Sequence, residues 1–274
     1  MDHVLTYQMR GQIALLTLNR PDKANAWNVE LHSAFHDALD RAGADPQVRV
    51  VVLTGAGRHF CAGADLSILD HVQGGGEPPI EMPPDSFMTP LSFAKPLIAA
   101  INGPTAGVGL VTALMCDIRF ASPEAVFVSA FARLGLVAEY GVSWLLPQIV
   151  GRAHAMDLLL SGRKVGADEA LAIGLVNRIV SDGDVVDAAV AYAQDLATHC
   201  SPASMAVIKQ QVHRHAVSSL AQADHEMQLV MEESLSGVDF SEGVSAFLNK
   251  RATAFASLGD GTLFTDLNGL DDPR

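Results

Sequence analysis

The N-terminal part of the chain alternates between two patterns of apolar positions. Residues 13–18 form a short apolar run rich in strand-forming side chains, which the segment Asn19-Arg20-Pro21 ends. From Asn28 the pattern changes, because Leu31 and Phe35 recur at the spacing of one helical face and Asn28 is suited to cap a helix. We therefore predict a strand over residues 13–18, followed by a helix that begins after Asn28.

Two later runs are almost wholly apolar. Residues 48–54 (VRVVVLT) and 96–101 (PLIAAI) have the composition of strands that are covered on both faces. Strands that alternate with helices in this way predict an α/β layer built from crossover units. Between the two runs, residues 69–95 contain three consecutive glycines and five prolines, which predicts a mobile loop or a broken helix. Loops this long often cover sites, and many others have no such role.

The last quarter of the chain contains few strand formers. Sequence compatible with helices begins at Pro202 and continues through residues 224–235 and 240–255. Such helices alone would expose apolar stripes, so we expect them to pack on the body of the protein or on a second subunit. The sequence therefore predicts an α/β core over residues 1–200 and a helical region over residues 201–274. Its Gly- and Asp-rich end, from Gly259, is expected to be disordered.

Composition narrows the class of protein. Of the 274 residues, 49% are hydrophobic and 18% charged, which is typical of a globular chain with a large core. A net charge of −13 argues against broad binding to nucleic acid or to an anionic membrane, because both require a basic face. Three cysteines without metal or disulfide spacing, and an N-terminus without a signal-peptide pattern, lead us to expect a cytoplasmic protein.

General motifs of catalysis are incomplete in this chain. The segment Gly107-Val108-Gly109 lacks the third glycine of a dinucleotide fingerprint, and Ser143 does not lie in a nucleophile elbow. His213 and His215 are two residues apart, so on a helix they cannot hold one metal ion together. These residues therefore give no support for a metalloenzyme.

Two segments do carry a pattern with chemical meaning. Residues 59–66 (HFCAGADL) and 101–110 (INGPTAGVGL) each place small residues where a strand gives way to a turn and a helix. Backbone N–H groups are then unobstructed, and two that converge would form an oxyanion hole. Tight packing of the turns without any site is the alternative.

A longer set of segments, in a fixed order, resembles the crotonase superfamily, also called the enoyl-CoA hydratase/isomerase family. The segments that carry the resemblance are RPDKANA (20–26), FCAGADL (60–66), INGPTAGVG (101–109), MCDIRFAS (115–122), LGLVAEYG (134–141), SGR (161–163), ALAIGLVNRIV (170–180) and SEGVSAFLNKR (241–251). Each is weak alone, but together they cover most of the chain.

The resemblance implies a fold, a substrate class and an assembly. It implies an α/β spiral of β-β-α units whose C-terminal helical region forms homotrimers or dimers of trimers. It also implies a CoA thioester substrate, with no metal or redox cofactor. By position, the oxyanion donors are the N–H groups of Ala64 and Val108. Positions that line CoA, largely through backbone contacts, correspond to Lys23, Ala24, Ala26, Ala62, Asp65 and Leu66. Phe247 and Lys250 match positions that reach a neighbouring subunit's ligand, although plain helix packing and surface charge are equally compatible.

The catalytic carboxylate separates the subclasses of the family. The resemblance places the two glutamates of hydratases at Val111 and Phe131, neither of which can move a proton. Glu139 instead matches the carboxylate of enoyl-CoA isomerases. Its apolar neighbours should raise its pKa towards the operating pH, whereas the start of the following helix should favour the ionised form. Capping of that helix is the alternative role for Glu139.

We therefore expect isomerisation of a 3-enoyl-CoA to a 2-enoyl-CoA, with Phe131, Val111 and Trp144 forming a dry acyl pocket. Lys23 and Arg58 are the expected partners of the CoA phosphates, with Lys250 from a neighbour. Three alternatives stay open: an enoyl-CoA hydratase or another crotonase-type reaction, an acyl-CoA-binding protein with little catalysis, and a structural oligomer whose site has decayed.

Overall fold

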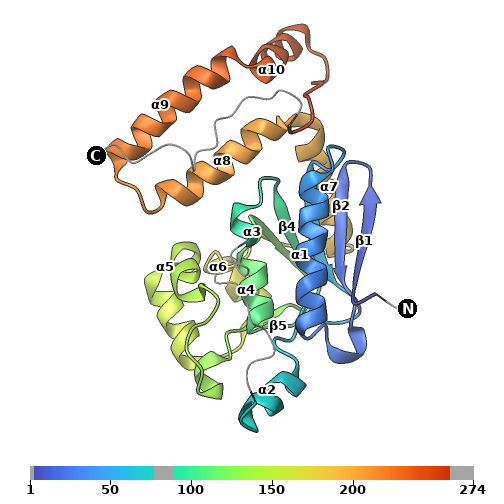
Figure 1. The fold of residues 1–274 in the computed structure, drawn as a ribbon, viewed down its shortest axis with the longest axis vertical. Helices are drawn as coiled ribbons and strands as arrows, with labels where there is room; N and C mark the ends of the chain where they lie inside the picture. The colour runs from blue at the N-terminus through green and yellow to red at the C-terminus, as the bar shows by residue number, and fades with distance from the viewer. Residues whose placement is uncertain (1–2, 77–88, 260–274) are drawn as a thin grey trace.

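A sheet in the order β1-β2-β3-β4-β6-β9 forms the centre of the computed structural model, which describes residues 3–76 and 89–259 (Figure 1). Its strands are β1 (Leu5–Arg10), β2 (Ile13–Leu18), β3 (Val50–Gly55), β4 (Leu97–Ile101), β6 (Ile118–Ala121) and β9 (Arg178–Ile179). β1 pairs antiparallel with β2, and the later neighbours pair in parallel. Parallel neighbours need a crossover connection, and helices supply most of these.

A smaller sheet and a set of helices complete the described part of the chain. The smaller sheet contains β5 (Thr105–Ala106), β7 (Val126–Val128) and β8 (Val165–Gly166). The helices of the core are η1 (Pro21–Lys23), α1 (Val29–Ala44), α2 (Leu66–Gln73), α3 (Thr89–Ser92), α4 (Val108–Leu114), η3 (Phe131–Leu134), α5 (Val142–Ser161), α6 (Ala167–Ala172) and α7 (Val185–His199). After them come α8 (Pro202–His215), α9 (Leu220–Ser236) and α10 (Val238–Asn249).

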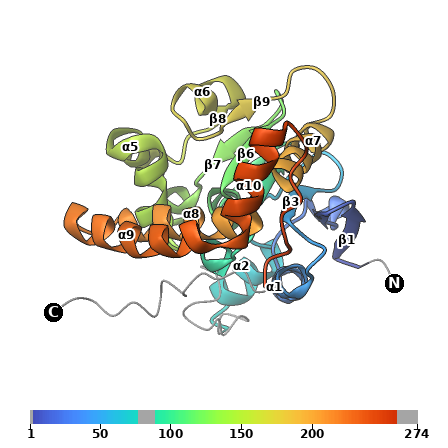
Figure 2. The ribbon, with the colours of Figure 1, turned by 90° about the horizontal axis from the view of Figure 1, so that it is seen from above.

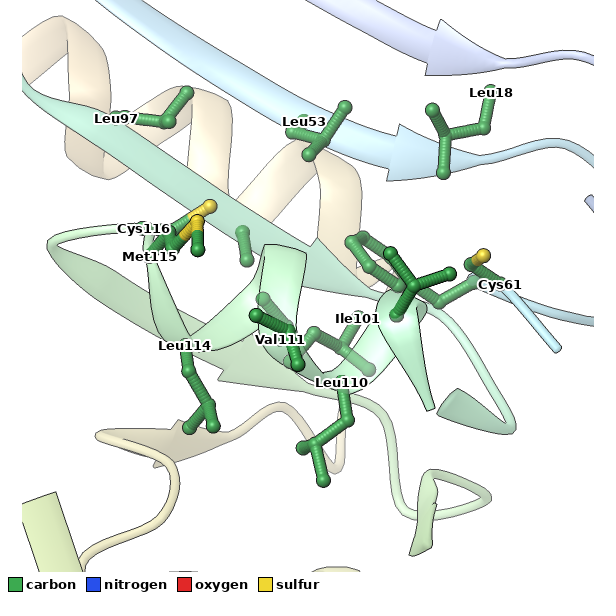
Figure 3. Close-up of a cluster of buried hydrophobic side chains, with 14 of the residues drawn as sticks. Leu18, Leu53, Cys61, Leu97, Ile101, Leu110, Val111, Leu114, Met115 and Cys116 are labelled. Atoms are coloured by element: carbon green, nitrogen blue, oxygen red, sulfur yellow. The ribbon is translucent and has the colours of Figure 1, made fainter. Parts of the chain in front are cut away.

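The inner strands β2, β3 and β4 are buried on both faces, and the two-residue period of β2 divides the core. Ile13 and Leu15 of β2 point into a cluster with α7, whose alanines at every fourth position let the helix approach the sheet closely. Leu16 and Leu18 point to the opposite face, towards α1 and α4. Figure 3 shows part of this second cluster, with Leu18 and other side chains from the strands facing those of α4. The predicted α/β class is confirmed.

Most of the predicted elements of the N-terminal part are confirmed. The runs at 13–18, 48–54 and 96–101 correspond to β2, β3 and β4, and the side chain of Asn28 caps α1 by accepting from Leu31 N at 2.9 Å. β1 was not predicted from the sequence, because the segment LTYQMR is half exposed and mixes polar with apolar residues. Its pairing with β2 compensates for a weak local signal.

Three helices continue from the core at the C-terminal end, as the sequence predicts. Figures 1 and 2 show α8, α9 and α10 stacked beyond the sheet at one end of the molecule. Lys209 of α8 anchors them to the core through an ion pair with Asp117 at 2.9 Å. The helix expected over 240–255 is shorter than predicted, because α10 ends at Asn249 and Lys250 takes a left-handed conformation with φ 51°.

Of the two alternatives for residues 69–95, the described parts agree with a broken helix. The segment begins within α2, which the carboxylate of Asp65 caps by accepting from Ser67 N at 3.1 Å. Its end carries α3, whereas residues 77–88 lie outside the described residues. The predicted disordered end lies outside them as well, apart from Gly259. No helix within residues 3–76 and 89–259 is long and apolar enough to cross a membrane.

Candidate functional site

Three loops meet at the carboxyl ends of β2, β3 and β4. These strands are parallel neighbours, so the loops that follow them, residues 19–28, 56–65 and 102–107, leave the sheet at the same edge. Ligands of open α/β sheets bind at this kind of edge. The two segments selected from the sequence, 59–66 and 101–110, both belong to this cluster.

The first two loops are joined through their backbones. Ala62 N donates to Ala24 O at 3.0 Å, and Trp27 pairs with the residues on both sides of Ala64. Trp27 N donates to Gly63 O at 2.7 Å, and Asp65 N donates to Trp27 O at 2.9 Å. This parallel bridge leaves Ala64 N pointing away from Trp27.

The second and third loops are equally close. Ala106 N donates to Cys61 O at 2.9 Å. Gly63 has a φ of +104°, and a Cβ on it would lie 3.2 Å from Ala106 O. A Cβ on Gly107 would lie 3.7 Å from the Cα of Gly63. The two turns therefore face each other at their glycines.

A third glycine lets α4 approach the second loop. A Cβ on Gly109 would lie 2.5 Å from Cys61 O and 2.6 Å from the Cβ of Cys61, which are distances that real Cβ atoms do not show. Gly109 is therefore required for packing rather than for a left-handed backbone, because it lies inside α4. This contact fixes the start of α4 beside the turn at Gly63.

The N–H groups of Ala64 and Val108 are available in this arrangement. Val108 is the first residue of α4, where N–H groups lack a partner within the helix. Over the described ranges of the chain, neither Ala64 N nor Val108 N donates to another residue. Two N–H groups on facing turns can bind a carbonyl oxygen and stabilise the negative charge that develops on it.

Glu139 is partly buried three residues before α5, a helix that packs on α4. Burial raises the pKa of its carboxyl, and a hydrogen bond from the Tyr140 side chain opposes this effect. Tyr140 and Gly141 both take left-handed conformations, with φ of 55° and 73°, and they form the turn that leads into α5. Glu139 is thus a carboxylate with a raised pKa, as a general base requires.

The structure contradicts the alternative role of Glu139 as a helix cap. The N-cap of α5 is Gly141, and no side chain caps it; only the main-chain oxygen of Glu139 accepts from Val142 N, at 3.1 Å. The expected apolar surroundings are also partly wrong, because Leu134 and Val137 are exposed to solvent. Partial burial and Tyr140, rather than a helix N-terminus, shift the pKa of Glu139.

The three residues expected to form the acyl pocket differ in burial. Val111 on α4 and Phe131 on η3 are buried in the main core cluster, and neither carries a polar group. Trp144 in the first turn of α5 is 38% exposed. The two positions at which the resemblance places the hydratase glutamates therefore carry apolar side chains that are buried in the core.

The positions expected to bind CoA lie mostly on the first two loops. Lys23 and Arg58 are exposed, and Ala24 takes a left-handed φ of 49°. The remaining expected positions are Ala26, which is buried, Ala62 and Leu66, which are exposed, and Asp65, which is half-buried. The carboxylate of Asp65 is already paired with the guanidinium of Arg20 at 2.8 Å.

Phe247 and Lys250 lie far from this cluster. Figure 1 shows α10 at one end of the molecule and α2, which follows Ala64, at the opposite end. The ring of Phe247 is 82% exposed, so it does not pack within its own chain. The structure therefore does not bring these two residues together with the loops of their own chain.

A cavity of about 590 Å³ lies elsewhere. It is lined by apolar residues of α4, α5 and α8, together with Lys209 and His213. It touches the C-terminal end of α4, whereas Val108 begins that helix, so roughly 9 Å of helix separates them. The cavity is therefore distinct from the cluster of loops.

Three residues of the site were not singled out from the sequence. The side chain of Asn25 is fully buried and donates to Ala56 O at 2.9 Å and His59 O at 2.7 Å. Arg20 and Tyr140 contact the carboxylates of Asp65 and Glu139. All three lie inside segments that carried the resemblance. Their contacts could not be predicted, because the sequence does not show which residue each of them meets in the fold.

The chain is similar to known proteins over most of its length. A family model described as "Enoyl-CoA hydratase/isomerase" matches residues 8–258. The chain is 38% identical to 1,2-epoxyphenylacetyl-CoA isomerase of Escherichia coli over 93% of this chain and 98% of that protein. It is 37% identical to the probable enoyl-CoA hydratase EchA12 of Mycobacterium tuberculosis over 92% of each. A crystal structure of a probable enoyl-CoA hydratase/isomerase from Mycobacterium abscessus superposes with a TM-score of 0.84 at 33% identity, covering 92% of this chain and 98% of the other.

Proposed function

The chain belongs to the enoyl-CoA hydratase/isomerase family, and we propose that within this family it isomerises 3-enoyl-CoA thioesters to 2-enoyl-CoA thioesters. The observation that carries the proposal is the single carboxylate, Glu139, held near the start of α5 with a raised pKa. Val111 and Phe131 leave no second acid or base at the positions where hydratases would need one. An isomerisation needs only one such group, because a proton leaves one carbon and returns to another.

The proposed reaction proceeds through a dienolate. Glu139 takes the proton from C2 of the 3-enoyl thioester, and the electron pair moves into the carbonyl, giving a dienolate oxygen. The N–H groups of Ala64 and Val108 hold this oxygen, each contributing about 3 kcal/mol to the transition state. Glu139 then returns the proton at C4, and the double bond moves to C2. The proposed reaction consumes and produces no electrons and needs no metal ion, because one proton and one double bond change position.

Exposed cations are proposed to bind the CoA phosphates. Lys23 and Arg58 lie on the first two loops, on the same edge of the sheet as Ala64. In a chain of net charge −13, an anionic ligand needs cations placed locally, because the overall field repels it. Lys250 of a neighbouring copy would supply a third cation.

We also propose that the chain assembles as a homotrimer or a dimer of trimers. Exposed large apolar side chains gather on α8, α9 and α10, including Val212, Leu220 and Phe247. Apolar side chains in water at this density are typical of an interface. Light scattering would measure the mass in solution, and a Phe247→Ser variant should weaken the assembly or acyl-CoA binding. A monomer at micromolar concentration would contradict the assembly.

One experiment separates the proposed reaction from its alternatives. The protein is incubated separately with trans-3-hexenoyl-CoA and crotonyl-CoA, and the absorbance of the conjugated 2-enoyl thioester is followed. Isomerisation predicts that conjugation appears from the first substrate and that crotonyl-CoA is consumed slowly. Rapid consumption of crotonyl-CoA would instead establish a hydratase. Tight binding of both thioesters without reaction would indicate an acyl-CoA-binding protein, and no binding would indicate a decayed site.

Glu139→Gln is the variant that tests the role of the carboxylate. It keeps the size of the side chain and removes the base, so turnover should fall while acyl-CoA affinity stays within a few-fold. Glu124→Gln is the matched control, because Glu124 is an exposed glutamate in the turn between β6 and β7. Loss of turnover in both variants, or in neither, would remove Glu139 from the mechanism.

A further inference from the structure

The peptide that carries Ala64 N–H is fixed from one side by the first loop. Trp27 bonds to Gly63 O and Asp65 N, at 2.7 and 2.9 Å, so the residues before and after Ala64 are both held by one residue. The direction of Ala64 N–H therefore depends on where Trp27 stands relative to Asp65.

Arg20 links these two positions through its side chain. Its Nη2 donates to the Oδ2 of Asp65 at 2.8 Å, and its Nη1 donates to the main-chain oxygen of Ala26, the residue before Trp27. Its main-chain N–H donates to the Oδ1 of the buried Asn25 at 2.9 Å. The guanidinium thus spans from the residue before Trp27 to the residue after Ala64.

The pair is well shielded, and the carboxylate of Asp65 is fully engaged. The side chains of Arg20 and Asp65 are 16% and 13% exposed. The other carboxylate oxygen of Asp65 accepts from Ser67 N at 3.1 Å and from Ser67 Oγ at 2.9 Å. The Arg20 hydrogen bond is the largest cause that lowers the pKa of Asp65, so this carboxylate stays ionised at neutral pH. An anion so engaged is a poor partner for the anionic phosphates of CoA.

We propose that Arg20 and Asp65 are positioning residues, whose ion pair across the first two loops sets the direction of the Ala64 N–H towards the thioester oxygen. This inference rests on the proposed function of Ala64 as an oxyanion donor. A displacement of about 1 Å at a reacting centre can reduce the rate roughly 100-fold. An interaction that fixes the position of this peptide therefore affects the rate of the reaction. Only arginine supplies two donors in a fixed fork for the two acceptors, whereas lysine supplies a point charge.

The most direct readout is the thioester carbonyl itself. Butyryl-CoA, isotope-labelled at the carbonyl carbon, is bound to the full-length protein, and its carbonyl stretch is measured by infrared difference spectroscopy. A donated hydrogen bond polarises the carbonyl and moves the stretch to lower frequency. We expect this shift in the wild type and a smaller shift in Arg20→Gln and Asp65→Asn. General loss of packing would lower the folded fraction without changing the frequency of the ligand that is bound.

Turnover of trans-3-hexenoyl-CoA, calculated per folded molecule, gives the second readout. We expect kcat to fall roughly 10- to 100-fold in Arg20→Gln, with KM changed less than about threefold, because the interaction acts in the transition state. Arg20→Lys should recover only part of kcat. The double variant Arg20→Gln/Asp65→Asn should be no slower than the worse single variant, since both remove one interaction.

A matched control lies in the same chain. Arg10 and Asp187 form an ion pair at 3.3 Å between β1 and α7, with side chains 37% and 77% exposed. Arg10→Gln should leave kcat and the carbonyl stretch unchanged. If Arg20→Gln does not fold, Asp65→Asn gives the same readouts with a smaller structural change.

The outcomes distinguish this inference from the proposed function. A wild-type carbonyl shift that persists in Arg20→Gln and Asp65→Asn, with unchanged kcat, would overturn the positioning role and leave the oxyanion hole intact. A wild type that binds butyryl-CoA without any shift would overturn the proposed function, and the positioning role with it. A wild type that shifts the carbonyl but does not isomerise would reject the reaction and keep the positioning role.

Discussion

The side chain of Tyr140 donates a hydrogen bond to the carboxylate of its neighbour Glu139. Tyr140 takes a left-handed conformation, with φ 55°, which is an unusual state for a residue with a large side chain. Its ring packs against the main core, so the donor is anchored. The bond gives the candidate base a fixed partner, and it lowers a carboxyl pKa that burial raises.

The first prediction concerns the pH dependence of the reaction. Glu139 must be ionised to take a proton, and burial raises its pKa above the ordinary value of 4.5. Activity should therefore rise with pH through a midpoint that lies above 4.5, the pH at which a free glutamate is half ionised. A pH profile of kcat/KM measures this midpoint. A rate that is flat down to pH 4.5, with the protein folded, would exclude a carboxyl with a raised pKa.

The second prediction concerns the cost of that raised pKa for stability. A carboxyl whose pKa is raised by folding stabilises the protein below its unfolded pKa, and this contribution is lost as pH rises through the folded pKa. Ionised Glu139 therefore opposes folding at neutral pH. Glu139→Gln should lower turnover roughly 100- to 10,000-fold and raise Tm slightly at pH 7. Thermal unfolding at pH 4 and pH 7 checks the sign, since the gain should vanish at pH 4.

The third prediction concerns Tyr140. Tyr140→Phe keeps the ring and removes the donor, so the pKa of Glu139 should rise further and the acid limb of the kcat/KM profile should move to higher pH. Turnover at pH 7 should fall a few-fold and recover as pH rises. Tyr192→Phe on α7 is the control, because that ring lies beside Arg178 on the other face of the sheet. A uniform loss at all pH values would mean that Tyr140 acts only through packing.

The fourth prediction concerns Gly109. A methyl group there would meet Cys61 O at 2.5 Å, so Gly109→Ala must push α4 away from the second loop. We expect a destabilisation of about 1–3 kcal/mol and a larger loss of activity, since Val108 N–H moves with the helix. Gly243→Ala inside α10 is the control, because its nearest atom beyond the helix lies 3.7 Å away. That variant should be neutral or stabilised by up to about 1 kcal/mol, as is usual for helices.

The fifth prediction concerns the exposed cation Lys23. Lys23→Ala should weaken acyl-CoA binding roughly two- to tenfold at low ionic strength, and the difference should shrink as salt screens the phosphates. Titration calorimetry at two salt concentrations measures both effects. Lys164→Ala, an exposed lysine near the start of β8, should bind as the wild type does. A loss of acyl-CoA affinity in Lys23→Ala that does not depend on the salt concentration would place this residue outside the phosphate site.

The sequence by itself determined the fold class and the segments in which the candidate site lies. The apolar runs of β2, β3 and β4 are covered on both faces, and a strand so buried is readable from composition alone. The small residues of 59–66 and 101–110 indicated close turns, because glycine is tolerated where backbones approach each other. Parallel strands then bring those turns to one edge of the sheet. The choice of Ala64 and Val108 within these turns came from the resemblance to the family.

Only the tertiary structure decided how these residues are supported. Arg20 and Asp65 are 45 positions apart and meet because two loops leave neighbouring strands together. Tyr140 takes a left-handed conformation without being a glycine, and its side chain affects the pKa of Glu139. β1, with a weak pattern of its own, forms because β2 offers it a free edge. Local periodicity reports which face of an element is buried, whereas long-range hydrogen bonds depend on the path of the whole chain, which no short segment encodes.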